Sequence, residues 1–247
     1  AQSHALGPRS RGASAPERRD PPPLIRGHAH NDYRHPRPLH DALDHGFTSV
    51  EADVFLVDGQ ILVGHDRPEL KPDRTLATLY LDPLTERIAH GNVPEPFTLM
   101  IDIKADGEST YAAIRAELQR RPALGRIRVV ISGDRPLGTL TQEAGAWAGI
   151  DGRLTDRQSR LDSKTMPWIS TSWASFFSWT GRGEMPALER LRLRSLVRQV
   201  SRRGRELRFW GAPDQENVWR ELTQAGVHRI NTDKLGLYAQ FVRDNRK

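Results

Sequence analysis

The sequence predicts an α/β protein with a closed (β/α)8 barrel built as a single domain. About eight short strand patterns alternate with helical patterns along the chain, which is the order of a parallel barrel. Polar residues collect where these strands end, and 247 residues are enough for one such barrel. A doubly wound open sheet is the second candidate, but the chain has no glycine-rich phosphate loop of the G-x-G-x-x-G or Walker type.

The expected elements follow from hydrophobic period and turn residues. Strands are expected at residues 24–30, 47–54, 61–63, 97–104, 127–131, 148–150, 168–170, 207–210 and 227–231. Asp58 and Gly59 are typical of a hairpin turn before 61–63. Helices are expected before Gly46, over 75–89 with an interruption near Pro83, over 108–120, 136–145, 186–203 and 215–225, and from 235 onwards.

Residues 1–23 are predicted to be a flexible leader, and 24–247 the barrel domain. The leader is rich in Pro, Arg, Ser, Gly and Ala, so it buries too little apolar surface to offset the entropy of ordering. It has no secretory apolar region and the chain lacks an initiator Met, which indicates that a targeting segment has been removed. We therefore expect a secreted protein, with the cytoplasm as the alternative; an expression remnant would look the same.

The composition of the chain limits the possible metal ligands and binding partners. The chain has no cysteine, so any metal is bound by oxygen or nitrogen. No apolar run approaches about 18 residues, which excludes a membrane-spanning helix by sequence. The formal charge of +6 and the pI near 10.0 fit anionic partners without selecting one. Arg202, Arg203, Arg205 and Arg208 favour a solvated helix end over a binding patch, and no nucleic-acid partner is expected because no such fold signature is present.

The strand at 47–54 carries two acids on one face. Glu51 and Asp53 alternate with Val50, Ala52 and Val54, so a period of two points both carboxylates the same way. Burying two like charges is costly, and a divalent cation such as Mg²⁺ or Ca²⁺ removes that cost. For this pair alone, an edge strand with a solvated face is the alternative. His65 follows at a short remove, where an imidazole can act as acid or base beside the metal.

Other strand ends repeat the pattern of paired polar residues. His28 and His30 share one face of the first strand, and Asp102 and Lys104 end the strand at 97–104. For a histidine taken alone, a hydrogen-bonded structural imidazole is as good an interpretation. Combined with the acids, the histidines favour a functional site.

The motifs together resemble the phospholipase-C-like phosphodiesterase superfamily. This superfamily includes glycerophosphodiester phosphodiesterases, phosphatidylinositol-specific phospholipases C and sphingomyelinase-D-like toxins. The similarity spans roughly residues 24 to 234 and rests on Gly27-His28-Ala29-His30-Asn31-Asp32-Tyr33, Val50-Glu51-Ala52-Asp53-Val54, Gly64-His65-Asp66, Ile101-Asp102-Ile103-Lys104 and Ile230-Asn231-Thr232-Asp233.

This resemblance implies a TIM barrel with one divalent cation and two catalytic histidines. Glu51, Asp53 and Asp102 fall on metal-ligand positions, Lys104 on a phosphate-contacting position and His65 on the second catalytic histidine.

The first catalytic histidine has two candidates. A Gly-His-x-x-Asn pattern, as in the toxins, assigns His28, whereas a His-Asn-x-Tyr pattern, as in the phospholipases C, assigns His30 with Asn31 as a further metal ligand. We favour His30 and keep His28 as a contact to the phosphate or to a metal ligand. The chain departs from the usual glycerophosphodiesterase pattern, because Ala29 and His30 replace Arg-Gly and no Glu-Asn-Thr segment appears.

Aromatic residues cluster after the strand at 168–170. Trp173, Phe176, Phe177 and Trp179 fit an aromatic wall for an ammonium head group, a lipid-facing surface or ordinary core packing. Trp210 ends a later strand, where it can line the same mouth. Trp173 and Trp210 are therefore the candidate substrate contacts.

The expected function is that of a metal-dependent phosphoric diester hydrolase acting on small glycerophosphodiesters. The alternatives are a phospholipase C- or D-type enzyme on intact phospholipid at a bilayer, and a non-catalytic anion- or membrane-binding barrel. Membrane contact stays open, although no long amphipathic basic helix stands out. No pattern in the sequence specifies an oligomeric state.

Overall fold

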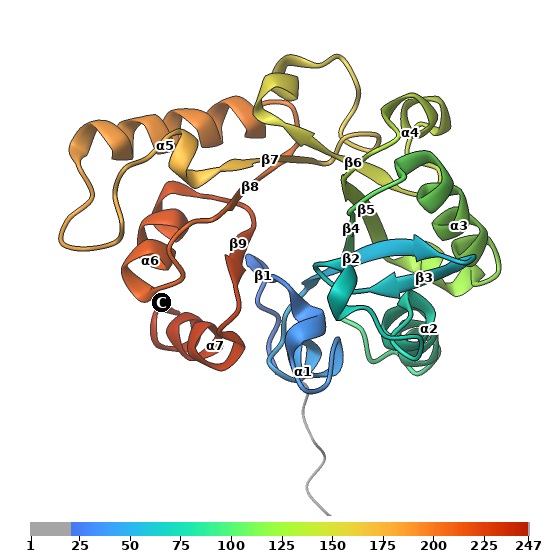
Figure 1. Cartoon of the computed structure of the whole chain (residues 1–247). Coiled ribbons are helices and arrows are strands. Elements are labelled where there is room, and N and C mark those ends of the chain that lie inside the picture. Colours follow the sequence, from blue (N-terminus) through green and yellow to red (C-terminus); the bar gives the residue numbers. More distant parts are fainter. Residues whose placement is uncertain (1–20, 247) are drawn as a thin grey trace, which may run out of the picture.

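A computed structural model describes residues 21–246, and these form a barrel of parallel strands surrounded by helices (Figure 1). Neighbouring strands follow the order β8-β7-β6-β5-β4-β2-β1-β9. A parallel bridge between Arg208 and Arg229, with a hydrogen bond of 3.1 Å from Arg229 N–H to the Leu207 carbonyl, joins the two ends of that order. The predicted (β/α)8 barrel is confirmed. The predicted leader, 1–23, lies mostly outside the described residues, so its boundary with the domain stays a prediction.

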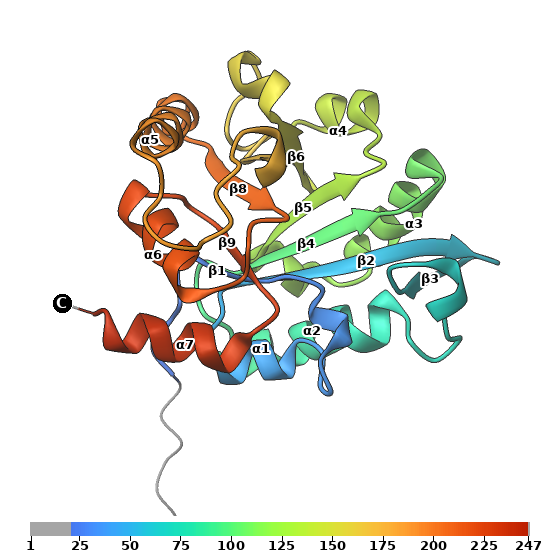
Figure 2. The same ribbon diagram turned by 60° about the vertical axis from the view of Figure 1, so that its left-hand side comes forward.

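The strands lie close to their predicted positions. Their bounds are β1 Gly27–Ala29, β2 Ser49–Val57, β3 Gln60–Val63, β4 Thr98–Ile103, β5 Arg128–Gly133, β6 Gly149–Arg153, β7 Trp168–Ser172, β8 Glu206–Trp210 and β9 Ile230–Thr232. β3 is antiparallel to β2 and lies outside the barrel order, beside the far end of β2 (Figure 2). The turn between them is Asp58-Gly59, as predicted, and both residues have positive φ, which suits a tight hairpin.

Helices connect most of the parallel strands. They are α1 His40–Asp44, α2 Asp82–Ala89, α3 Gly107–Gln119, α4 Leu137–Glu143, α5 Ala187–Ser201, α6 Glu216–Ala225 and α7 Leu235–Asp244. The interruption expected near Pro83 is a change of helix type, because a π-helix at Ala77–Leu81 runs into α2 and Pro83 lies in the first turn of α2. Between β6 and β7 the chain forms only a 3-10 helix, Leu154–Gln158, so this connection leaves the regular pattern.

Side chains on the two faces of the barrel strands pack in different environments. Outward residues such as Val50, Ala52 and Val54 are fully buried in the main apolar cluster, which also includes helix residues. Met100, Val130 and Trp168 form a separate small cluster on the opposite face, inside the barrel. Towards the carboxyl ends of the strands the interior becomes polar, with buried His28, Glu51, Asp53, Asp151, Ser170 and Arg208. Among residues 21–246, no helix has the length and apolar character needed to cross a bilayer.

Gly133 allows β5 to end against the neighbouring strand. Its φ is +72°, and a Cβ atom there would lie 2.2 Å from the Ile103 carbonyl oxygen and 2.3 Å from Oδ1 of Asp102. Gly59 has a similar φ of +79° but has open space around it. Alanine in place of Gly59 would therefore add only backbone strain, whereas alanine in place of Gly133 would add backbone strain and a steric clash.

We expect Gly59→Ala to lower the free energy of unfolding by about 1–2 kcal/mol, the cost of a left-handed residue. Gly133→Ala should cost clearly more, because backbone atoms must also move away from the new methyl group. Urea unfolding of both variants checks this. Equal losses would mean that the barrel absorbs the collision beside Asp102 without strain.

Candidate active site at the carboxyl end of the barrel

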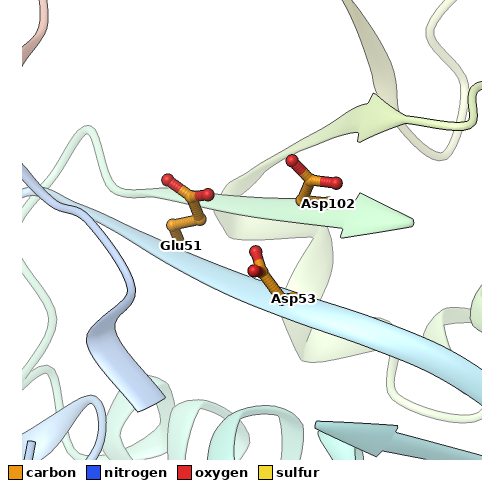
Figure 3. Close-up of side chains that lie close together, drawn as sticks. All are labelled: Glu51, Asp53 and Asp102. Atoms are coloured by element: carbon orange, nitrogen blue, oxygen red, sulfur yellow. The ribbon is translucent and has the colours of Figure 1, made fainter. Parts of the chain in front are cut away.

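Three carboxylates from two adjacent strands converge on one space (Figure 3). Glu51 and Asp53 lie on β2, Asp102 lies on β4, and the strand register pairs Asp53 directly with Asp102. One oxygen of each carboxylate lies within 4.8 Å of the other two. The alternation of side chains along each strand thus points the three carboxylates to the same side of the sheet, as expected.

Burial makes this arrangement electrostatically costly. It raises the pKa of Asp102 to about 6, and the nearby charges of Glu51 and Asp53 add to the effect. Burial and the charge of Glu51 likewise raise the pKa of Asp53. The crowding thus opposes ionisation of Asp53 and Asp102, and a bound divalent cation reverses that penalty.

The two oxygens of Asp53 have different surroundings. Oδ2 lies 2.8 Å from the Tyr33 hydroxyl, 2.9 Å from Nδ1 of His65 and 2.8 Å from Nζ of Lys104. Oδ1 is buried and has no hydrogen-bond partner among residues 21–246. A buried carboxylate oxygen without a donor is costly, and a cation is a suitable partner for it. Glu51, Asp53 and Asp102 therefore fit a hard divalent cation by donor type and by this unpartnered atom.

The loop after β1 is anchored below this site by Asp32. Its buried carboxylate accepts hydrogen bonds from the Leu39 N–H at 2.6 Å and from the Tyr80 hydroxyl at 2.8 Å. Burial raises the pKa of Asp32 to about 7. These contacts fix the turn that delivers the Tyr33 hydroxyl to Asp53. Asp32 and Tyr33 belong to the first family-like motif of the sequence, but the sequence alone predicted no role for either residue.

Both histidines at the mouth pair one ring nitrogen with a carboxylate. Nδ1 of His30 lies 2.8 Å from Oδ1 of Asp233, and Nδ1 of His65 lies 2.9 Å from Oδ2 of Asp53. In the described part of the chain, Nε2 of each ring makes no hydrogen bond, and both side chains are partly exposed. Burial lowers the pKa of His30, but the hydrogen bond that its ring donates to Asp233 and the charge of Glu51 outweigh it, so the net shift of the pKa is upward.

His28 lies deeper than His30. It is fully buried, with Nδ1 2.7 Å from the Ser49 hydroxyl and Nε2 3.3 Å from Glu51 Oε2. Burial and the positive charge of Arg208 lower its pKa well below the usual value, so the ring is neutral. This position suits a contact to a metal ligand. The choice between His28 and His30 as first catalytic histidine stays a prediction.

Asn31 and Lys104 border the carboxylates. Nζ of Lys104 lies 3.6 Å from Asp102 in addition to its contact with Asp53. Oδ1 of Asn31 is 3.0 Å from the Tyr33 hydroxyl, so Asn31 lies next to a residue that contacts the carboxylates. The predicted role of Asn31 as a metal ligand is untested.

The two candidate tryptophans lie in different environments. Trp173 is only 3% exposed and stacks on Phe177 at 4.2 Å, in the main core. Trp210 is half-buried at the end of β8, with the Arg153 guanidinium over its ring at 5.3 Å. Core packing therefore accounts for Trp173, whereas Trp210 remains available at the mouth.

A second ionic group lies beside the carboxylates, and the sequence analysis missed it. Arg208 on β8 lies 3.6 Å from Glu51 and 3.3 Å from Asp151. Asp151 on β6 is fully buried, and Arg208 and Arg153 lower its pKa despite that burial.

The prediction that Arg202, Arg203, Arg205 and Arg208 form a solvated cluster is wrong for two of these residues. Arg208 forms these ion pairs, and Arg205 is buried and donates to main-chain carbonyls at Asp156, Ser159 and Leu161.

Comparison with known proteins agrees with this class of fold. Residues 19–98 match the family model described as the AIM6-like phosphodiesterase domain, and residues 206–236 match the glycerophosphoryl diester phosphodiesterase family. Crystal structures with the same fold include a glycerophosphodiester phosphodiesterase from Parabacteroides distasonis, with a TM-score of 0.61 and 12% identity over 92% of this chain and 100% of that one. Another, from Agrobacterium tumefaciens, has a TM-score of 0.58 and 16% identity, over 89% and 100%. The resemblance to the phospholipase-C-like phosphodiesterase superfamily is confirmed.

Relatives with more closely similar sequences share one name. Altered inheritance of mitochondria protein 6 from Eremothecium gossypii is 29% identical, over 90% of this chain and 71% of the relative. A homologue of that protein from Arthroderma benhamiae is 28% identical, over 83% and 80%. The chain is thus similar to AIM6-like proteins, with the family model matching residues 19–98.

The acid cluster predicts a specific pH dependence in metal-free protein. The folded pKa of Asp102 is about 6, above the unfolded value, so its contribution to stability is present below about pH 4 and is lost as pH rises through about 6. In a chelating buffer, Asp102→Asn should remove this loss, which is about 2 kcal/mol. The measurement is the difference in urea-unfolding free energy between wild type and variant from pH 4 to 7. A constant difference would show that the carboxylate of Asp102 is not crowded.

Proposed function

We propose that this chain is a metal-dependent phosphodiesterase that hydrolyses glycerophosphodiesters. The observation that carries the proposal is the unpartnered Oδ1 of Asp53 within the three-carboxylate cluster, next to two histidines that each pair with a carboxylate. The solved neighbours named as glycerophosphodiester phosphodiesterases support the substrate class. Secretion remains a separate prediction.

Glu51, Asp53 and Asp102 are the residues that would hold one divalent cation, Mg²⁺ or Ca²⁺. When bound, that cation supplies positive charge against the negative charge that builds on the phosphate in the transition state. Lys104 adds a second positive charge at the same place, because its ammonium group lies between Asp53 and Asp102. His28 and Arg208 hold Glu51 from below.

The two mouth histidines suit acid and base roles. In each, the carboxylate at Nδ1 orients the ring, which leaves Nε2 for the substrate. One imidazole removes a proton from the attacking oxygen, and the other protonates the leaving oxygen.

The attacking oxygen comes from the substrate or from water. The chain has no cysteine, and among residues 21–246 no serine or threonine hydroxyl hydrogen-bonds to His30 or His65. We propose that the adjacent glycerol hydroxyl attacks phosphorus and expels the head group, giving a five-membered cyclic phosphate. Direct attack by water is the alternative.

The activity itself is tested by phosphorus NMR on a panel of glycerophosphodiesters and intact phospholipids, with Mg²⁺, Ca²⁺ or a chelator. Turnover of glycerophosphodiesters that stops on chelation is the expected result. Turnover of vesicle phospholipid alone would favour the bilayer alternative. If no phosphodiester reacts with either metal, the enzymatic proposal fails.

Removing either mouth histidine should slow turnover strongly. We expect His30→Ala and His65→Ala each to lower kcat by about 10²–10⁴-fold, the usual effect of losing a general acid or base. His90→Ala is the matched control, because His90 is exposed at the end of α2 and bonds only a main-chain carbonyl. If His28→Ala abolishes turnover at saturating metal while His30→Ala does not, the assignment moves to His28.

The source of the attacking oxygen has its own test. A substrate analogue without the adjacent glycerol hydroxyl should not react. Undiminished turnover of that analogue, with oxygen from labelled water in the first-formed product, would rule out the cyclic route.

A further inference from the structure

The mouth of the barrel has two chemically different arcs. β1, β2 and β4 carry the carboxylates and histidines described above, whereas β5, β6 and β8 lie further round the barrel (Figures 1 and 2). The second arc presents Arg135 just after β5, Arg153 at the end of β6 and Trp210 at the end of β8. None of these three has a task in the reaction proposed above.

Arg135 is a cation with unused hydrogen-bonding capacity. A guanidinium has five N–H donors, and the hydrogen bond that Arg135 makes is from Nη1 to the main-chain oxygen of Asp151, at 2.6 Å. Its Nε is buried without a partner, and within residues 21–246 no carboxylate forms a salt bridge with it. Such a group is costly unless an acceptor arrives.

Arg153 lies beside Arg135 and is only partly neutralised. Its Nη1 is 3.1 Å from Asp151 Oδ2, but Asp151 also pairs with Arg208 and accepts hydrogen bonds from Ser132 and Ser170. The nearby Asp156 accepts the Arg153 main-chain N–H at 2.8 Å. Burial and the charge of Arg153 lower the pKa of Arg135, which is the effect of two cations held close together.

We propose that Arg135 and Arg153, beside the Trp210 ring, bind an anionic group on the head group of the substrate, either a carboxylate or a phosphomonoester. Paired guanidinium groups with free donors recognise such oxygens in a bidentate way, and neutral or cationic head groups gain nothing from them. This assignment rests on the proposed phosphodiesterase function and specifies its substrate class.

The spacing of the strands supports one substrate reaching both arcs. The register places Asp102 beside Ser132 on β5, and the Ser132 hydroxyl lies 2.8 Å from Asp151 on β6. Arg135 therefore follows the strand next to β4, and Arg153 ends the strand after that, so their backbones are separated from that of Asp102 by one and two strand spacings, about 5 and 10 Å. The long arginine side chains cover part of this separation, and a phosphodiester held at Asp102 and Lys104 can extend its head group towards them.

The test compares head groups that differ by one anion. Glycerophosphoserine differs from glycerophosphoethanolamine by a carboxylate, and glycerophosphoinositol phosphate differs from glycerophosphoinositol by a phosphomonoester. We expect kcat/KM to favour the more anionic member of at least one pair by about 10- to 100-fold, the range for charged hydrogen bonds. The responding pair identifies the anion.

Substitutions of the two arginines test whether they cause the preference for anionic head groups. Arg135→Gln and Arg153→Gln should each reduce the anionic preference to near unity. Arg67→Gln is the matched control, because Arg67 is an exposed arginine after β3 and should keep the full preference. Urea unfolding checks that the variants are folded. A wild-type ratio near unity in both pairs, or a preference that survives in both folded arginine variants, would overturn the proposal.

A binding measurement separates this proposal from the proposed activity. In a chelating buffer, calorimetric titration of the wild-type chain with the members of each glycerophosphodiester pair should show tighter binding of the more anionic member in at least one pair, and Arg135→Gln should remove that difference. This result would support the anion site even if no substrate turned over. Equal binding of the two members in both pairs would contradict it even in an active enzyme.

Discussion

The site depends on how the carboxylate of Asp53 is shared. Oδ2 receives donors from Tyr33, His65 and Lys104, which come from the β1 loop, the segment after β3 and the end of β4. Oδ1 keeps no protein partner in the described part of the chain. These contacts orient Asp53 and hold three separate segments of the mouth around one atom, while the opposite oxygen stays free for a cation. Even the hairpin serves this arrangement, because the Gly64 N–H bonds the Asp53 carbonyl at 3.0 Å and so brings His65 back over β2.

The polar upper half of the barrel explains how such a crowded acid group stays folded. Glu51 contacts neutral His28 and cationic Arg208, and Arg208 in turn pairs with Asp151. Glu51, Arg208 and Asp151 therefore each have a counter-charge, as buried ions require. Buried ion pairs of this kind contribute little net stability compared with apolar packing. Most of the stability must therefore come from the main apolar cluster and from the small cluster inside the barrel. The interior is thus arranged for orientation of the carboxylates more than for stability.

The sequence predicted the parts of the site that obey a local rule. A period of two is enough to place Glu51 with Asp53 and Asp102 with Lys104, and parallel strands bring both pairs to one edge. Arg208 and Asp151 follow the same rule on β8 and β6, but their partners lie on other strands, so their roles depend on barrel closure. Arg208 was also masked by its neighbours, because exposed Arg202 and Arg203 suggested a solvated cluster. The 3-10 connection after β6 and the burial of Trp173 likewise depend on tertiary packing, which overrides local pattern.

A hollow also lies at the end of the barrel opposite the carboxylates. A cavity of about 530 Å³ lies against the first residues of β5 and β6, lined by Arg128, Trp147 and Lys164 among others. Strand direction puts those residues at the amino end of the barrel, away from the carboxylates. In this fold the strands emerge together at their carboxyl ends, where loops can vary without disturbing the packed core. That division explains why the reacting group and the arginine pair share one mouth: adjacent strands fix the chemistry through register, while the strands further round are free to carry residues that distinguish one head group from another.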